Sequence, residues 1–131
     1  MTGGIPGRFD GDFDQTVRHL TAIFEDFTEA RDVWRSARHR LATIRRDPDP
    51  EWAAVRPEAS ALADATVRVL RSATLLGIAA REAVDLLVAA GADLTDMGDP
   101  RVAWFTVASA AIVAALRDFA AERLAGNPGH A

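Results

Sequence analysis

A run of arginines in the first third of the chain holds the side chains best placed to do chemistry. The stretch ARDVWRSARHRLATIRR, residues 30–46, contains six arginines and one histidine. Guanidinium groups at this density can contact nucleic-acid phosphates or an acidic partner, and they can also form the positive end of a charged helix. Which of these three roles applies depends on the secondary structure that carries the arginines.

Arg35 and His39 form the most suggestive pair in this run. They stand four residues apart, so a helix would place them one turn apart on the same face. The pair resembles the arginine and histidine that share a helix in the HEPN ribonucleases, with a spacing shorter than in that motif. The resemblance covers these two residues alone, and it implies RNA binding or an RNA-acting enzyme as one possible function.

Other catalytic and metal-binding patterns are missing from the sequence. The chain has no cysteine, its serines lack a neighbouring base, and no glycine-rich loop follows a strand. Its three histidines are scattered, and none stands in the Glu-x-x-His arrangement of helical di-metal sites: His19, His39 and His130. We therefore expect no catalytic residue, no metal and no cofactor.

The composition is that of one soluble domain. The chain has 131 residues, 49% of them hydrophobic and 26% charged, with a net charge of -4. All its basic residues other than histidine are arginine, which indicates the codon bias of a high-GC bacterial genome. A negative whole-molecule field opposes binding to a polyanion, so we expect nucleic acid not to be the partner.

Several features predict a cytoplasmic protein. The absence of cysteine is compatible with a reducing compartment, and the N-terminus MTGGIPGRFDGDFD lacks the basic and apolar regions of a secretory signal. The longest uncharged run, residues 102–116, is shorter than the ~20 residues that span a bilayer. We expect no membrane association.

Apolar residues predict one long helix after a flexible arm of residues 1–11. Asp12 can cap it. Two columns of residues, three apart, each repeat every seven positions, which is typical of a coiled-coil-like seam. The first column is Phe13, Leu20, Phe27, Trp34 and Leu41, and the second is Thr16, Ile23, Ala30, Ala37 and Ile44.

Prolines divide the middle of the chain. Pro48 and Pro50 end the first helix, and Asp49 with Pro50 predicts the start of a short helical segment. Pro57 predicts a break or kink, followed by a second long helix over residues 57–90. Its predicted seam is lined by small residues, in the columns Thr66, Ala73, Ala80, Leu87 and Val69, Leu76, Ala83, Ala90. Gly77 fits a close approach of another helix there.

A third long helix is predicted from Asp99 and Pro100 to about residue 125, before a loose tail of residues 126–131. Its first half is apolar on every side, and such a helix must be buried all round. The two other helices of one chain cannot surround this helix on all sides, so we expect a second copy of the chain to complete the cover. We expect this assembly to be a homodimer through Trp104, Phe105 and Ile112.

The arginines of the first helix fall into two groups. Arg31, Arg38 and Arg45 share one column beside the seam, and we expect them at the interface with a partner helix. Arg35, His39 and Arg46 point away from the seam and are expected to be solvated. Residues 10–29 are acidic and residues 30–46 basic, which suits the helix dipole, antiparallel pairing of two copies, or an acidic partner protein.

Aromatic residues at helical spacing offer an alternative. They could line a pocket for a small apolar ligand between the first and third helices, although such residues also form plain core. The candidates are Phe24, Phe27, Trp34, Trp104 and Phe105.

The sequence therefore predicts an all-α bundle of three long helices and one short segment, with heptad-like packing, in a single domain of residues 12–125. Its expected function is a non-catalytic interaction module, an oligomeric adaptor or regulatory subunit. A helical sensor of an apolar ligand is the alternative, and an RNA-binding protein or HEPN-like ribonuclease a weaker one.

Overall fold

A computed structural model describes residues 11–125 of the chain, and over that range it is all α-helical. The three helices are α1 (Gly11–Arg45), α2 (Trp52–Ala89) and α3 (Pro100–Ala125). The predicted arm, apart from Gly11, and the predicted tail of residues 126–131 lie outside the described residues.

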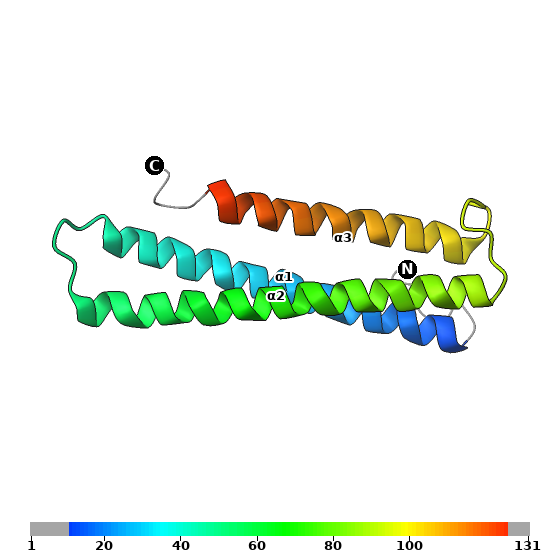
Figure 1. Cartoon of the computed structure of the whole chain (residues 1–131), viewed down its shortest axis with the longest axis horizontal. Helices are drawn as coiled ribbons and strands as arrows, with labels where there is room; N and C mark the ends of the chain where they lie inside the picture. Colours follow the sequence, from blue (N-terminus) through cyan, green and yellow to red (C-terminus); the bar gives the residue numbers. More distant parts are fainter. Residues whose placement is uncertain (1–10, 126–131) are drawn as a thin grey trace.

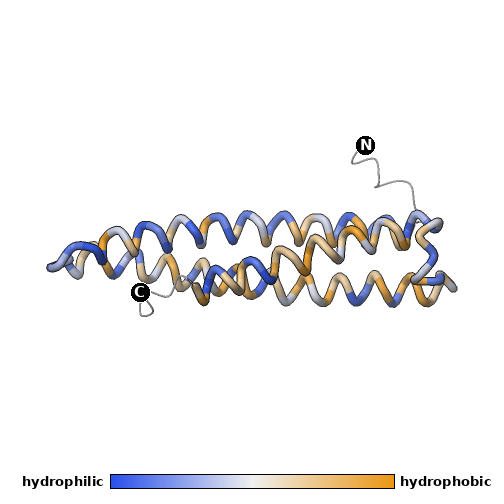
Figure 2. Tube along the Cα trace, turned by 90° about the horizontal axis from the view of Figure 1, so that it is seen from above, coloured by the Kyte–Doolittle hydropathy of each residue, from blue (hydrophilic) through white to orange (hydrophobic). Residues whose placement is uncertain are grey.

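The helices form an elongated bundle. α1 and α2 run antiparallel and cross near their middles, and α3 returns beside them in the same direction as α1 (Figure 1). α3 ends well before the loop between α1 and α2. The two longer helices therefore project beyond it as a two-helix extension, called here the α1–α2 tip (residues 39–61). Hydrophobic residues concentrate where the three helices run together, and the projecting end is more hydrophilic (Figure 2).

α1 forms over the predicted range, but Asp12, predicted as its N-cap, lies inside the helix, which already includes Gly11. Acidic residues occupy its first turn and Arg45 its last, which complements the helix dipole. The first predicted column is buried at all five positions, and Phe27 at its centre is fully buried. In the second column Ala30 and Ala37 are buried, while the three other residues are half-buried. The two columns together form the face that α1 presents to the rest of the bundle.

The predicted short segment and the break at Pro57 are wrong, because α2 is one continuous helix from Trp52. Proline lacks the N–H that would bond to the carbonyl of Ala53, four residues earlier. Pro57 and Ala53 are both exposed, so water can hydrate that carbonyl and the helix continues. The start also differs from the prediction: Glu51 is the N-cap residue, and Asp49 instead bonds through its N–H to Asp47 Oδ1 at 3.0 Å in the loop.

The buried face of α2 differs from the predicted seam in one of its two columns. Val69, Leu76 and Ala83 are buried as expected. In the other predicted column Leu87 is buried as expected, but its three earlier members are half-buried. The residues one position before those three are buried instead: Ala65, Ser72 and Ala79. The error arises because Ser72 is polar, which hides its burial from a hydrophobic pattern.

Both ends of the α2–α3 loop follow local rules. Gly91 has a φ of +77°, and the N–H of Ala92 reaches back to the carbonyl of Leu87 at 3.0 Å, which closes the end of α2. At the start of α3, Asp99 Oδ1 accepts the backbone N–H of Arg101 at 3.0 Å. Asp99 is thus the predicted N-cap residue, with Pro100 in the first helical position.

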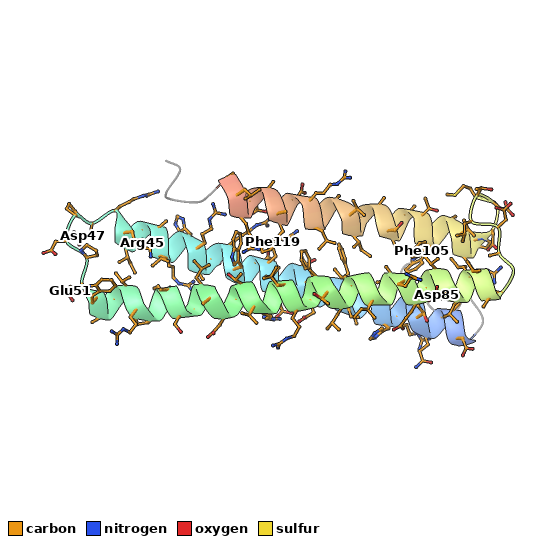
Figure 3. The ribbon with its side chains drawn as sticks, viewed as in Figure 1. Arg45, Asp47, Glu51, Asp85, Phe105 and Phe119 are labelled. Atoms are coloured by element: carbon orange, nitrogen blue, oxygen red, sulfur yellow. The ribbon has the colours of Figure 1, made fainter. Side chains whose placement is uncertain are left out.

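α3 is held to the hairpin by large side chains. The Phe119 ring packs edge-on against Phe27 at 6.1 Å and against Trp34 at 4.8 Å between ring centroids. Near the other end of α3, Trp104 packs against Phe13 at 6.1 Å. Phe105 and Phe119 are labelled along α3 in Figure 3, one near each end of the contact. Aromatic rings therefore fill the space between α3 and the other two helices.

Gly77 does not mark a close approach of two helices within the chain. It is exposed in the middle of α2, and a Cβ atom added there would meet nothing within 4 Å. The glycine therefore lowers the stability of the helix, and no contact within the described chain requires its small size.

Replacing Gly77 with alanine should raise the free energy of unfolding by about 1 kcal/mol, because alanine loses less backbone entropy in a helix. Chemical denaturation measures the change. Ala63→Gly, at another exposed position of α2, is the matched control and should lower stability by a similar amount. A loss of stability in Gly77→Ala would show that another chain packs closely against this position.

Candidate functional site

The outer surface of α3 is the most unusual surface of the described chain. We call it the outer α3 face, and its members follow one another at alternating spacings of four and three residues. They are Ala103, Val107, Ala110, Ala114, Arg117, Ala121 and Leu124. Val107 and Leu124 are 70% and 77% exposed. The spacing is that of a helix-packing seam, yet no part of the described chain covers it.

The outer α3 face has no charged side chains on or beside it over most of its length. Residues 102–116 contain no ionisable side chain. Four of the seven members are alanine, and such small side chains let a second helix approach closely. Exposed apolar patches of this kind mark sites of association with other molecules.

The single chain leaves this side of α3 exposed, so all-round burial of α3 would require the second copy expected from the sequence and stays a prediction. Only four residues of α3 are buried: Val102, Ile112, Ala115 and Phe119. Ile112, predicted at the interface between copies, instead packs in the core of the single chain with Phe27 and Leu76. Trp104 and Phe105 are half-buried at the contact with the other helices.

α3 also has the length and composition of a membrane-spanning helix, the only such helix among residues 11–125. It is 26 residues long, its most apolar window has a mean hydropathy of 1.5, and 17% of that window is buried. Length and hydropathy alone do not separate a membrane helix from an apolar helix that meets protein.

The C-terminal part of α3 is anchored to α1 by arginines. Arg35 binds the Glu122 carboxylate with two N–H groups, one of them Nε at 2.7 Å from Oε2. Arg38 donates from Nη1 to the backbone carbonyl of Glu122 at 2.8 Å and stacks over the Trp34 ring at 5.0 Å. That carbonyl lies in the last turn of α3, so Arg38 supplies a hydrogen bond that the helix cannot make itself.

The ion pair shifts the pKa values of Glu122 and Arg35 in the directions expected for charges that stabilise one another. The hydrogen bond from Arg35 lowers the pKa of the Glu122 carboxyl, against a smaller opposing effect of burial. The same bond raises the pKa of Arg35. Arg35 is exposed, as predicted, with 43% of its side chain accessible, but its long side chain also reaches α3, a contact that the sequence did not predict.

The predicted arginine column is divided by the structure. Arg31 has only 18% of its side chain exposed and lies with Arg38 on the side of α1 that meets α3, where both act on the Glu122 carboxylate. Arg45 is at the α1–α2 tip, near Asp47 and Glu51 and far from Phe119 (Figure 3). The partner helix that the sequence placed beside Arg31 and Arg38 is, within one chain, α3 itself.

The aromatic residues predicted to line a ligand pocket lie in three different places. Phe27 and Trp34 are core residues against Phe119. Phe24 and Trp104 are brought together in a shallow groove of about 180 Å³ between α1 and α3. The remaining lining is apolar apart from one threonine: Leu20, Thr21, Ala108, Ala111 and Ile112. Phe105 is elsewhere, packed with Phe13, Val17 and Leu87.

The described residues hold no constellation typical of catalysis. His39 is exposed on α1, and the arginine with which it would form a HEPN-like pair is bound to Glu122. No group of three or more His, Asp or Glu side chains among residues 11–125 could hold a metal ion.

A polar link between α1 and α2 escaped the sequence analysis. Asp26 accepts a hydrogen bond from the buried Ser72 hydroxyl at 2.7 Å and another from Arg68 at 2.9 Å. The bond from Ser72, followed by that from Arg68, lowers the pKa of the Asp26 carboxyl. A serine at a seam position of an otherwise apolar helix was the available signal. The link fixes how the two helices align, because only one alignment brings all three groups together.

Comparison of the chain with known protein families, curated proteins and solved structures gives no match. A function for this chain must therefore be argued from its own surfaces.

The Glu122 contact should make stability depend on pH. A depressed carboxyl pKa adds stability above the pKa of the unfolded chain, about 4.3, and that stability is lost as the pH falls through the lower folded value. Glu122→Gln should therefore lower the free energy of unfolding near pH 7, and its difference from the wild-type chain should shrink in acid. Chemical denaturation of both chains, near pH 7 and in acid, measures these differences in the free energy of unfolding.

Arg35→Gln provides the control for that experiment. In its background Glu122→Gln should cost less, because the partner of the carboxylate is already gone. Equal costs in the two backgrounds would show that Arg35 and Glu122 do not interact in solution.

Proposed function

We propose that the chain is a non-catalytic helical interaction module, an oligomeric adaptor or regulatory subunit of the cytoplasm. The outer α3 face carries the proposal, because it is an exposed seam with the spacing of a helix contact and no helix of residues 11–125 lies upon it. Burying such a face removes apolar surface from water, which is the main driving force of protein association.

The charge distribution supports a protein partner over nucleic acid. Arg35, Arg38 and Arg40 are engaged within the chain, by Glu122 in the first two cases and by Glu58 in the third. The net charge of -4 adds no long-range attraction to a polyanion. The exposed residues of the outer α3 face offer little to a phosphate, since Arg117 is its one charged member.

The packing of α3 supports a protein partner over a bilayer. Its C-terminal turns carry Glu122 bound to Arg35 of α1, and Arg31 and Arg38 of α1 also act on that carboxylate. Inserting α3 into lipid would require breaking this pair or burying charged residues of α1, at a cost of several kcal/mol. A protein surface can cover the outer α3 face alone.

Association should be visible in the isolated protein and should depend on Ala114, an exposed member of the outer α3 face. Sedimentation velocity should show a mass above that of one chain that rises with concentration. Ala114→Glu should reduce association at least tenfold, because a carboxylate in an apolar contact loses its hydration.

Ile78→Glu is the matched control, since Ile78 is 52% exposed on α2 and outside the outer α3 face. It should leave association unchanged. A wild-type chain that stays monomeric up to high micromolar concentration would contradict the oligomeric form of the proposal.

The groove at Phe24 and Trp104 favours a second candidate function, the binding of a small apolar ligand. Its lining is mostly apolar, but about 180 Å³ is small beside the 300–1,000 Å³ of typical ligand sites. Only a compact molecule would fit. A ligand held there would contact α1 and α3 together and could report on the packing between them.

Ala111→Trp tests this alternative by filling the groove. A neutral, environment-sensitive dye should bind the wild-type chain with enhanced fluorescence and lose that signal in the variant. Sedimentation of the same variant is the control for an indirect effect through association. Dye binding that survives Ala111→Trp would place the ligand elsewhere and contradict the groove as its site.

A further inference from the structure

We propose that the partner of the outer α3 face is the same face of a second copy, with the two α3 helices antiparallel and centred near residue 112. The inference rests on the proposed function and adds to it the identity, direction and alignment of the contact. In this alignment Ala103 lies opposite Ala121 of the other copy, Val107 opposite Arg117, and Ala110 opposite Ala114.

The spacing of the face identifies its cover as a helix. The members alternate at intervals of four and three residues, the pattern that brings side chains repeatedly to a helix lying alongside. Alanine at four of the seven positions lets that helix approach closely along its whole length.

The lack of charge favours a second copy over a different protein. Selective pairing of unlike helices relies on complementary charges beside the seam, and residues 102–116 have none. A face that is apolar apart from one arginine near one end is complementary to itself under a two-fold axis, which is the commonest symmetry of protein dimers.

A lipid surface fits the face poorly. Helices that bind membrane surfaces combine large apolar or aromatic side chains with a basic rim that meets anionic lipid. Here alanines predominate, and Arg117 is the only basic side chain on the face.

Arg117 determines the direction of the pair. In a parallel, in-register pair each residue meets its own copy, so two Arg117 guanidinium groups would be held together in an apolar contact. In the antiparallel pair each Arg117 instead lies beside Val107, and its aliphatic stem can cover the valine while its charged end reaches water.

The size of the face predicts a reversible dimer. A helix of 26 residues is about 39 Å long and about 10 Å wide, so one face covers roughly 400 Å² per copy. Two copies then bury roughly 800 Å², less than the ~1,200 Å² at which stable complexes begin. The pair should therefore dissociate as the protein is diluted.

Disulfide cross-linking can test direction and alignment, because the natural chain has no cysteine. Ala103→Cys and Ala121→Cys are prepared separately, one with a tag that changes its mass, and are oxidised alone and mixed. The antiparallel pair predicts a mixed cross-linked dimer and little cross-linking of either variant alone. In that pair the two copies of residue 121 are about 27 Å apart along the helix axis.

A spin label at Leu124→Cys gives a second measurement at the C-terminal end of the face, where Leu124 is 77% exposed. Antiparallel pairing predicts about 36 Å between the two labels, since each is twelve residues from the centre. A parallel pair would bring them within about 15 Å, from the width of two adjacent helices. Circular dichroism confirms that each labelled chain is folded.

The outcomes separate this inference from the proposed function. Self-cross-linking of Ala121→Cys, or a short distance between labels, overturns the antiparallel pair. Association without mixed cross-linking shows that copies meet through another surface, which overturns this inference and leaves the proposed function standing. A monomeric chain at all concentrations overturns both.

Discussion

The bundle depends on the contact of one aromatic ring with two others. Phe119 reaches from α3 into the space between the other helices and packs edge-on against Phe27 and Trp34. Edge-on packing brings the positive rim of one ring to the negative face of another, and it also removes a large apolar area from water. Without this contact, α3 would be held by Trp104 near its start and by the Glu122 ion pair near its end. Between these two contacts, Ile112 and Leu116 join the same core cluster as Phe119, but their side chains are smaller than its ring.

α3 thereby presents two surfaces of different character. The inner surface carries large residues that fill a wide space, and the outer α3 face carries small ones that suit a narrow contact. A helix made only to complete a three-helix bundle needs the inner surface alone. The outer α3 face is therefore the feature that separates this chain from a self-sufficient bundle, and it supports assembly in preference to chemistry.

Sequence patterns predicted local features well and relations between helices poorly. The buried column of α1 and the Asp99 cap follow from residue spacing and backbone chemistry within one segment, and both are present. The prediction of a break at Pro57 was wrong, because near the start of a helix water can replace the one backbone hydrogen bond that a proline removes. Ser72 was misjudged because its partner Asp26, on another helix, decides where its side chain goes, and the contact of Arg35 with Glu122 was missed for the same reason. For α3, hydropathy indicated burial, but three-dimensional packing decides which sides of a helix are covered.

The α1–α2 tip gives the molecule two regimes of stability along its length. Over the three-helix body, opening one helix exposes core shared with two others, whereas the tip has only the contact of one helix with another. Its buried anchors are few, chiefly Leu41 and Val55, with Arg40 and Glu58 paired at the surface. Backbone amides at the tip should consequently exchange with solvent hydrogen through local separation of the two helices, well before the body opens. The end that carries Trp52 can thus change shape while the α3 surface keeps its form.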